Sequence, residues 1–322
     1  MSLPPLAPVV PVSLAGKKIL VTGPTSQVAV PLMQHLGSIA QITALARFTR
    51  QKDIDRMHAF RARVLRKDLA VDTLDDVPTD FDYVLHFAVV KTGDFEYDLQ
   101  ANAIGTGRLI AHCKAVKGFL LVSTTGVYQY AGHELLAEDA PLGDNHRAMF
   151  PTYSISKIAQ ETVARFAAQE HGVPLTIARL SVPYGDNGGW PLFHALMMKE
   201  GMAIDIHPDQ PNQYTPLHAE DYCRHIPYLL AAGTPAGTVV NWGGTEVVGV
   251  EDWCAYITEL TGNSANFNLT PTAFGSLAAD VSRLQGLLGS EPVTTVSWKQ
   301  GLLRLLQHKA AHLLKPEYQR PA

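Results

Sequence analysis

Short apolar runs alternate with amphipathic stretches over the first 180 residues, and this alternation limits the possible folds more than any other feature. The runs have the length and composition of buried strands, and they cover residues 18–22, 41–46, 63–66, 82–89, 118–123 and 174–179. Helical periodicity is clear in residues 28–36, 95–116 and 153–171. Strands that alternate with helices in this way predict a parallel sheet with helices on both faces. The predicted fold class is therefore α/β, with a doubly wound parallel sheet.

The turn after the first predicted strand has the features of an anion site. Gly23 follows the strand directly, and residues 28–36 form the next predicted helix. A strand, a turn and a helix present free backbone N–H groups and the positive end of the helix dipole to a phosphate. The usual fingerprint has three glycines, but Ser26 and Ala29 occupy the two later positions here. A dinucleotide phosphate is expected to contact Gly23, Thr25, Ser26, Gln27 and Val28.

The residues after the second predicted strand bear on which dinucleotide binds. An Asp or Glu at this place would contact the ribose hydroxyls of NAD. The chain has Arg47 and Arg50 instead, and a guanidinium pairs well with the 2′-phosphate of NADP. Two exposed loop arginines are the alternative interpretation. The sequence therefore predicts NADP as the cofactor, with NAD as the alternative.

Tyr153 and Lys157 are four residues apart in a predicted helix, which places both side chains on one face. A neighbouring ammonium favours the phenolate and lowers the pKa of a tyrosine, so the two residues can work as an acid–base pair. The alternative is a packed tyrosine beside a solvated lysine, since this spacing also arises by chance. Thr124 directly follows the fifth predicted strand, at the edge where doubly wound sheets bind their ligands.

Composition excludes several classes of protein. The formal net charge of −4 gives no footprint for nucleic acid, and no apolar run is long enough for a membrane helix. Cys113, Cys223 and Cys254 are far apart, so they form no metal-binding spacing and fit a reducing, cytoplasmic location. The histidines also predict no metal site. Residues 1–15 are rich in proline without a basic start, which predicts an N-terminal tail.

A series of motifs carries a resemblance to a known family. In chain order they are Val21 to Gly23, Asp68-Leu69, His86 to Ala88, Asn102 to Thr106, Ser123 to Tyr128, Tyr153 to Lys157, Arg179 through Tyr184-Gly185, and Leu217 to Asp221. Their order and separations resemble the extended short-chain dehydrogenase/reductase family, also called the NAD-dependent epimerase/dehydratase family. The resemblance implies a Rossmann-type fold with a smaller C-terminal substrate lobe, and an enzyme that transfers hydride.

The resemblance also implies roles for single residues. Tyr153 matches the catalytic acid/base, Lys157 matches the residue that holds the nicotinamide ribose, and Thr124 matches the catalytic hydroxyl that hydrogen-bonds the reacting oxygen. Asn102 matches a central-helix position, for which a plain helix-packing role is an equal alternative. The other positions that match cofactor contacts are Asp68, Leu69, Phe87, Ala88 and Val89.

The chain departs from the family where nucleotide-sugar members bind a diphosphate. Val182 stands where they usually have Asn, and Tyr214 and Thr270 stand where they usually have Arg. Each lost cation removes a charge-assisted contact of roughly 1.5–3 kcal/mol. We therefore expect a smaller or more apolar substrate, in contact with Thr125, Val182, Trp190 and Tyr214.

Three functions remain open from the sequence. The main hypothesis is an NAD(P)-dependent oxidoreductase that acts on a small or apolar carbonyl or alcohol. The first alternative is a nucleotide-sugar epimerase or dehydratase that uses bound NAD, and the second is a non-catalytic dinucleotide-binding sensor. The resemblance implies a homodimer as the assembly, with a small molecule as the only other partner.

Domain boundaries follow from the same resemblance. Residues 1–185 are expected to form the dinucleotide-binding Rossmann domain, with the tail at 1–15. Residues 186–322 are expected to form mainly the substrate-binding lobe, while residues 215–245 return to the first domain. Helices are predicted in this half at 191–199, 219–232, 250–261 and 298–313.

Overall fold

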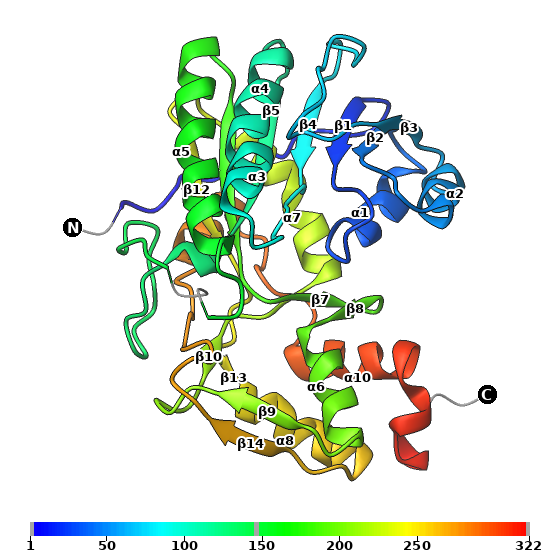
Figure 1. The fold of residues 1–322 in the computed structure, drawn as a ribbon, viewed down its shortest axis with the longest axis vertical. Helices are drawn as coiled ribbons and strands as arrows, with labels where there is room; N and C mark the ends of the chain where they lie inside the picture. Colours follow the sequence, from blue (N-terminus) through cyan, green and yellow to red (C-terminus); the bar gives the residue numbers. More distant parts are fainter. Residues whose placement is uncertain (1–2, 145–147, 320–322) are drawn as a thin grey trace.

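A seven-stranded sheet forms the centre of the computed structural model, which describes residues 3–144 and 148–319 (Figure 1). Each neighbouring pair in the sheet is parallel. Across the sheet the strands are β12 (Thr238–Trp242), β6 (Leu175–Leu180), β5 (Gly118–Thr124), β4 (Tyr83–His86), β1 (Lys18–Thr22), β2 (Gln41–Ala46) and β3 (Arg63–Arg66). The α/β fold class predicted from the alternating pattern is confirmed.

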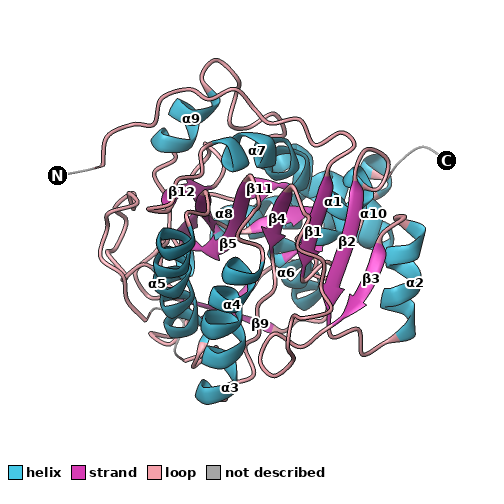
Figure 2. Ribbon diagram, turned by 90° about the horizontal axis from the view of Figure 1, so that it is seen from above, coloured by secondary structure: helices cyan, strands magenta, loops and turns pink. Residues whose placement is uncertain are grey.

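Helices cover both faces of the sheet, which explains why its central strands are apolar on both sides. Ile19, Leu20 and Val21 of β1 are all 0% exposed, although they point to alternate faces. One face carries α1 (Ala29–Leu36), α7 (Ala219–Ala231) and α9 (Ser282–Leu288), and the other carries α4 (Gly105–His112) and α5 (Tyr153–His171) (Figure 2). Helix α2 (Gln51–Ala59) packs beside β3 at the sheet edge.

The order of the strands locates the ligand crevice. From β1 the chain runs outward through β2 and β3, and then crosses to β4 on the other side of β1. Ligands of doubly wound sheets bind at such a switch point, outside the carboxyl ends of the two strands. The residues directly after β1 and β4, Gly23 and Phe87, therefore face one crevice.

The C-terminal part of the chain forms a second apolar core below the sheet (Figure 1). Buried residues of this core include Trp253, Ile257, Leu302 and Leu305. Its helices are α6 (Trp190–Lys199), α8 (Val250–Thr261) and α10 (Trp298–Lys309). Short strands form three small sheets: β9 (Ala203–Ile206) with β14 (Asn266–Leu269), β10 (Gln213–Tyr214) with β13 (Val248–Gly249), and β7 (Pro183–Gly185) with β8 (Gly188–Gly189) and β11 (Leu217–His218).

Later segments of the chain lie against the first core. Strand β12 pairs with β6, and α9 packs against both β12 and α7. Residues near the N-terminus join them, because Leu6 and Val9 pack on the same core and the backbone N–H of Val9 donates to the Leu287 carbonyl at 3.1 Å. The return of α9 and the docking of the N-terminal residues had no signal in the sequence pattern.

The long helix predicted at residues 95–116 is interrupted. The structure has α3 (Phe95–Leu99), a π-helical turn η1 (Gln100–Ile104) and then α4. Asn102 lies in the π turn, where its side chain accepts from the Val90 N–H and donates to the Val90 carbonyl, each at 2.8 Å. The predicted helix 298–313 also ends early, at Lys309, before the 3₁₀ turn η3 (Ala311–Leu313). No described helix is long and apolar enough to cross a membrane.

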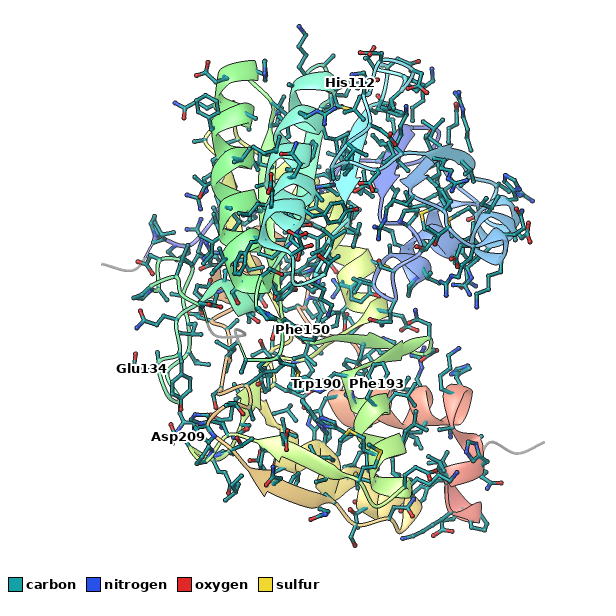
Figure 3. The ribbon with its side chains drawn as sticks, in the orientation of Figure 1. His112, Glu134, Phe150, Trp190, Phe193 and Asp209 are labelled. Carbon is teal, nitrogen blue, oxygen red and sulfur yellow. The ribbon has the colours of Figure 1, made fainter. Side chains whose placement is uncertain are left out.

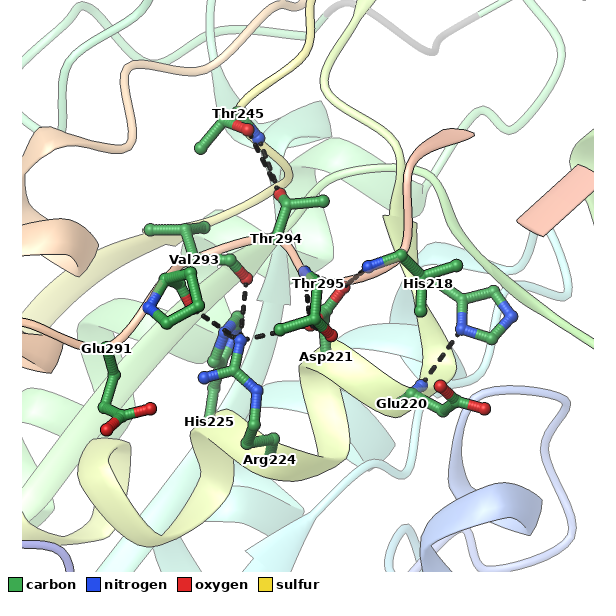
Figure 4. Close-up of polar contacts among 12 residues, drawn as sticks. His218, Glu220, Asp221, Arg224, His225, Thr245, Glu291, Val293, Thr294 and Thr295 are labelled. Carbon is green, nitrogen blue, oxygen red and sulfur yellow. Dashed lines mark hydrogen bonds and ion pairs between the residues drawn. The ribbon is translucent and has the colours of Figure 1, made fainter. Parts of the chain in front are cut away.

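The start of α7 ties the C-terminal segment to the sheet domain (Figure 4). The Asp221 carboxylate is 0% exposed and accepts hydrogen bonds from the backbone N–H groups of Thr295 and Val296 and from the Thr295 hydroxyl. Arg224 donates to the same carboxylate at 3.1 Å. His218 caps the helix by accepting from the Glu220 N–H at 3.3 Å. The motif at residues 217–221 thus has a structural role.

Candidate functional site

A cavity of about 290 Å³ opens at the carboxyl ends of β1, β2 and β4. Its walls bring together residues that are distant in the sequence. Of the residues expected to contact a dinucleotide, the structure places these on the cavity wall: Gly23, Thr25, Ser26, Arg47, Arg50, Asp68, Leu69, Phe87, Ala88, Val89 and Asn102.

Gly23 has no tolerable replacement in the turn after β1. Its φ is +63°, and an added Cβ would lie 2.7 Å from the backbone nitrogen of Ala88. The Ser26 hydroxyl accepts from the Ala29 N–H at 3.2 Å and so satisfies a donor in the first turn of α1. Close approach of the backbone and an ordered helix start fit the binding of a phosphate at this turn.

Gln27 and Val28 do not line the cavity. The Gln27 side chain donates to the Gly188 carbonyl at 3.1 Å, and its own carbonyl accepts from the Asn187 amide at 2.7 Å. The Val28 carbonyl accepts from the Tyr222 hydroxyl at 3.0 Å. These two residues therefore connect the phosphate turn to β8 and α7, which the sequence motif alone did not indicate.

The cavity wall after β2 contains a carboxylate as well as the two expected arginines. Arg50 Nε donates to Asp53 at 2.8 Å, and Asp53 is 5% exposed on the cavity wall. Arg47 donates to the Tyr97 hydroxyl at 3.0 Å, and Tyr97 donates to the Asp68 carboxylate at 2.8 Å. Asp53 and Tyr97 were missed from the sequence, although an acid three residues after Arg50 in a helix is a recognisable pairing.

Thr124 and Tyr153 meet at the carboxyl end of β5. Thr124 is the last residue of this strand and Tyr153 is the first residue of α5, and the Thr124 hydroxyl is near enough to the Tyr153 phenol to lower its pKa. The Ser154 hydroxyl donates to the Gly126 carbonyl at 2.7 Å, which fixes the start of α5 against the turn after Thr124. Two hydroxyls held together in this way can both hydrogen-bond one substrate oxygen.

Lys157 lies one turn further along α5 and is 2% exposed. Its ammonium donates to the Val122 carbonyl at 2.7 Å and to the Gln160 amide oxygen at 2.6 Å. Burial lowers the pKa of Lys157 to about 8, against an opposing effect of Glu161. The ammonium therefore lies against β5, two residues before the strand ends at Thr124.

The pKa of Tyr153 shifts in the direction opposite to the one expected from the Tyr–Lys spacing. Burial raises it, and the hydrogen bond with Thr124 offsets this only in part. The physical reason is desolvation of the phenolate, which outweighs the nearby hydroxyl. A second cation lies close by, since Lys91 Nζ is 3.9 Å from the Phe150 ring centroid and 5.7 Å from that of Tyr153. The sequence gave no signal for Lys91.

A second cavity of about 280 Å³ lies beyond Phe150, toward the C-terminal part of the chain. Figure 3 shows Phe150 and Trp190 at the junction of the two parts. Phe274 connects them, with its ring centroid 6.0 Å from that of Phe150 and 6.2 Å from that of Trp190. The described residues that line this cavity are Met149, Trp190, Phe193, His194, Met197, Ala203, Ile204, Asp205, Asn212, Val250, Ala273 and Phe274.

The four residues expected to contact the substrate, Thr125, Val182, Trp190 and Tyr214, differ in their placement. Tyr214 is 3% exposed and its hydroxyl donates to the Gly275 carbonyl at 2.9 Å, so it packs behind Trp190. Thr125 is 4% exposed. Val182 is half-buried with a φ of +32°, a conformation that is rare for a β-branched residue. Of the four, only Trp190 is on the cavity wall.

Comparison with known proteins places this geometry in a family. The model of the NAD dependent epimerase/dehydratase family matches residues 19–243, from β1 to the end of β12. A dTDP-glucose 4,6-dehydratase of an Actinoplanes species is 27% identical over 252 residues, which cover 67% of this chain and 73% of that protein.

Two solved structures share the fold over nearly their whole length. UDP-glucuronic acid 4-epimerase from Bacillus cereus, in complex with UDP-glucuronic acid and NAD, has a TM-score of 0.76 at 24% identity and covers 90% of this chain and 98% of its own. DesIV, a dTDP-glucose 4,6-dehydratase from Streptomyces venezuelae with NAD bound, has a TM-score of 0.77 at 21% identity and covers 93% and 99%. The chain belongs to the NAD-dependent epimerase/dehydratase family, of the extended short-chain dehydrogenase/reductase type.

Proposed function

We propose that this chain uses NAD to oxidise and re-reduce a secondary alcohol of a nucleotide-linked sugar, as an epimerase, with Tyr153 as the acid/base. The juxtaposition of Thr124, at the end of β5, and Tyr153, at the start of α5, carries the proposal. This pair lies at the carboxyl end of β5, with buried Lys157 one turn along the helix. The main hypothesis from the sequence, a plain oxidoreductase for a small carbonyl, becomes the second candidate.

The chemistry assigned to each residue follows from its position. NAD would be held by the turns after β1 and β4 and would supply the acceptor, and later the donor, of the hydride exchanged with the sugar carbon. Tyr153 takes the hydroxyl proton as the carbon is oxidised and gives it back on reduction. Thr124 hydrogen-bonds the same oxygen and stabilises its charge. Lys157 holds the nicotinamide ribose, and its positive charge favours the phenolate of Tyr153.

NAD replaces NADP as the favoured cofactor. Asp53 lies on the adenosine side of the cavity and neutralises Arg50 at 2.8 Å, so this site has less net positive charge than the arginines alone suggest. A carboxylate also suits ribose hydroxyls better than a 2′-phosphate. The related structures with bound NAD support the same choice.

Epimerisation is favoured over dehydration by the residues next to Thr124. Loss of water from the sugar needs an acid for the leaving hydroxyl as well as the Tyr153 proton relay. The residues directly after Thr124 are Thr125 and Gly126, so this turn contributes no carboxylic acid that could protonate a leaving hydroxyl. Hydride return to the opposite face needs only that the sugar ring turn in the site.

The second candidate function keeps a specific observation in its favour. Among the described residues that line the cavity beyond Phe150 there is no Lys or Arg, and Val182, Tyr214 and Thr270 replace polar anchors. An apolar carbonyl or alcohol would need none of these charges.

A homodimer formed through α4 and α5 is also proposed, and Phe166 on α5 is 67% exposed there.

The proposal is tested by two measurements: identification of the cofactor that the purified protein retains, and a survey of the substrates that it converts. Protein purified without added dinucleotide is denatured, and the released nucleotide is identified as NAD or NADP. The intact protein is then given UDP- and dTDP-hexoses, and separately small ketones with NADPH. Bound NAD with sugar epimers as products supports the proposal. NADPH consumption with ketones would support the second candidate, and tight NAD binding with no turnover would favour a sensor.

A further inference from the structure

A chain of buried hydrogen bonds leads away from the Lys157 ammonium. Lys157 Nζ donates to Gln160 Oε1 at 2.6 Å, and Gln160 Nε2 donates to Thr106 Oγ1 at 2.8 Å. Thr106 Oγ1 lies 2.7 Å from Nε2 of His86, and Nδ1 of His86 lies 2.5 Å from the Thr22 hydroxyl. Side chains from α5, α4, β4 and β1 thus form one connected line.

The direction of each bond follows from the number of protons present. The Thr106 hydroxyl donates to the Asn102 carbonyl at 2.5 Å, so its oxygen accepts from both Gln160 and His86. The His86 tautomer that completes this arrangement carries its proton on Nε2, donates to Thr106 and accepts from the Thr22 hydroxyl at Nδ1. Gln160 Nε2, which lies 3.2 Å from the same ring nitrogen, then packs against it without a shared proton. Burial lowers the pKa of His86 to about 3, so the ring stays neutral and this arrangement persists around neutral pH.

The far end of the line reaches the dinucleotide cavity. Thr22 directly precedes Gly23, and its hydroxyl accepts from the backbone N–H of Ala88 at 3.3 Å. Gly23 and Ala88 both line the cavity. The turns after β1 and β4 are therefore joined to Lys157 by this line of side chains, through the backbone of Gly23 and Ala88.

Every side chain in the line is buried. Gln160, Thr106 and Thr22 are 0% exposed, His86 is 1% exposed and Lys157 is 2% exposed. A buried ammonium is costly unless it is hydrogen-bonded, and the Val122 carbonyl is its other acceptor among the described residues. The amide oxygen of Gln160 and the Val122 carbonyl are thus the two acceptors that offset the cost of burying this charge, and the Glu161 carboxylate favours it further.

We propose that Gln160 is a positioning residue for Lys157: its amide oxygen holds the ammonium beneath the end of β5, and Thr106 and His86 hold the amide. The inference rests on the proposed function for the task of Lys157, which is to bind the nicotinamide ribose. These hydrogen bonds hold the lysine side chain in place before the ribose binds. Binding of the dinucleotide therefore loses less side-chain entropy at Lys157.

Other charged groups surround Lys157, and their states are set by their own partners. Glu161, the next residue after Gln160, is held by Arg179 Nη2 at 2.7 Å and by the Ser123 hydroxyl at 2.5 Å. His86 is neutral, as argued above. Tyr153 begins the same helix, Lys91 lies 5.7 Å from the Tyr153 ring centroid, and Asp98 of α3 is bonded to Thr152 at 2.6 Å. A substitution at Gln160 is therefore expected to change the charge state of Lys157 while these other charged groups keep their partners.

Two substitutions at this position should shift the pH dependence of NAD binding in opposite directions. NAD affinity of the intact protein is measured by calorimetry from about pH 6 to about pH 9, a range that spans Lys157 titration. Gln160→Met removes the acceptor, so the midpoint above which affinity is lost moves down, by about one pH unit for one lost hydrogen bond to a charged group. Gln160→Glu supplies a charged acceptor, so the midpoint moves up.

The control is Gln169→Met, an exposed glutamine on the same helix, which leaves the midpoint at its wild-type value. If Gln160→Met and Gln160→Glu each lost NAD affinity by the same factor at every pH, with no shift of the midpoint, Gln160 would only support the fold. That result would overturn the inference. If Gln160→Met does not fold, the Gln160→Glu result decides alone. Wild-type protein that binds NAD but converts no nucleotide sugar would contradict the proposed function without affecting this readout.

Discussion

Glu161 of α5 and Arg179 of β6 form a buried ion pair. Arg179 donates through Nη2 and Nε to the two carboxylate oxygens, at 2.7 and 3.1 Å, and it also donates to the Glu138 carbonyl at 2.9 Å. Arg179 is 1% exposed and Glu161 is 2% exposed. The arginine belongs to one of the motifs recognised in the sequence, and its task is to anchor α5 to β6.

Glu161→Ala is expected to destabilise the fold by about 3–5 kcal/mol, because it leaves the Arg179 charge buried without its partner. The free energy of unfolding in urea measures this effect. The matched control is Glu170→Ala, an exposed acid on the same helix, which should change stability by less than about 0.5 kcal/mol. A similar small change in both variants would mean that the buried pair contributes little.

At the scale of single residues, the sequence is informative wherever the partners are close along the chain. Tyr153 and Lys157 could be paired because they share one helix face. Lys91 and Gln160 could not be assigned, since their importance comes from neighbours in space such as Phe150 and Thr106. Desolvation of Tyr153 was missed for the same reason, because burial depends on the whole fold.

The interrupted helix beside the cavity is the most informative element. The π turn η1 places Asn102 against the backbone of Val90, and α4 then begins at Gly105. An added Cβ at Gly105 would lie 2.8 Å from the Leu69 carbonyl oxygen. Leu69 is on the cavity wall next to Asp68, so this glycine lets the helix approach the cofactor site closely. Periodicity alone predicted one continuous helix because it contains no information on such contacts.

Gly105→Ala is expected to weaken NAD binding about tenfold, which is about 1.4 kcal/mol. The added methyl must push the backbone at Leu69, and with it the cavity wall. Gly107→Ala in the same helix is the control, since its Cβ would lie 2.7 Å from Val163 Cγ1 on α5 and so would strain the packing of the helix without touching the cavity wall. Calorimetric affinities for the two variants should differ clearly, and equal affinities would show that the close approach has no effect on the cavity.

At the scale of the whole molecule, the alternation of strands and helices was enough to predict the parallel sheet. The order of its strands and the family motifs then located the cavity. Contacts between the ends of the chain could not be predicted, because Val9 and Leu287 pair without any local pattern. The same is true of Asp221, which lies in a recognised motif but acts by binding Thr295 and Val296.

Asp221→Ala should loosen the segment that links α9 to α10. It removes the acceptor for two backbone N–H groups and the Thr295 hydroxyl, so we expect a loss of about 3–5 kcal/mol in the free energy of unfolding. Cleavage by a protease near residues 293–296 should also become faster. Asp75→Ala, at an exposed acid, is the control. Wild-type cleavage and stability in the Asp221 variant would contradict this role.

The central claim is that hydride passes between a sugar carbon and an enzyme-held dinucleotide, with the proton carried by Tyr153. The most direct measurement is rapid mixing of NAD-loaded protein with nucleotide-linked hexoses, followed through the absorbance of reduced nicotinamide. We expect a transient rise of this absorbance in the wild type. In Tyr153→Phe at equal NAD occupancy, the rise should be slower by about 10²–10⁴-fold, the usual contribution of acid–base catalysis. No transient with any sugar in the wild type, or the same transient in the variant, would contradict the account.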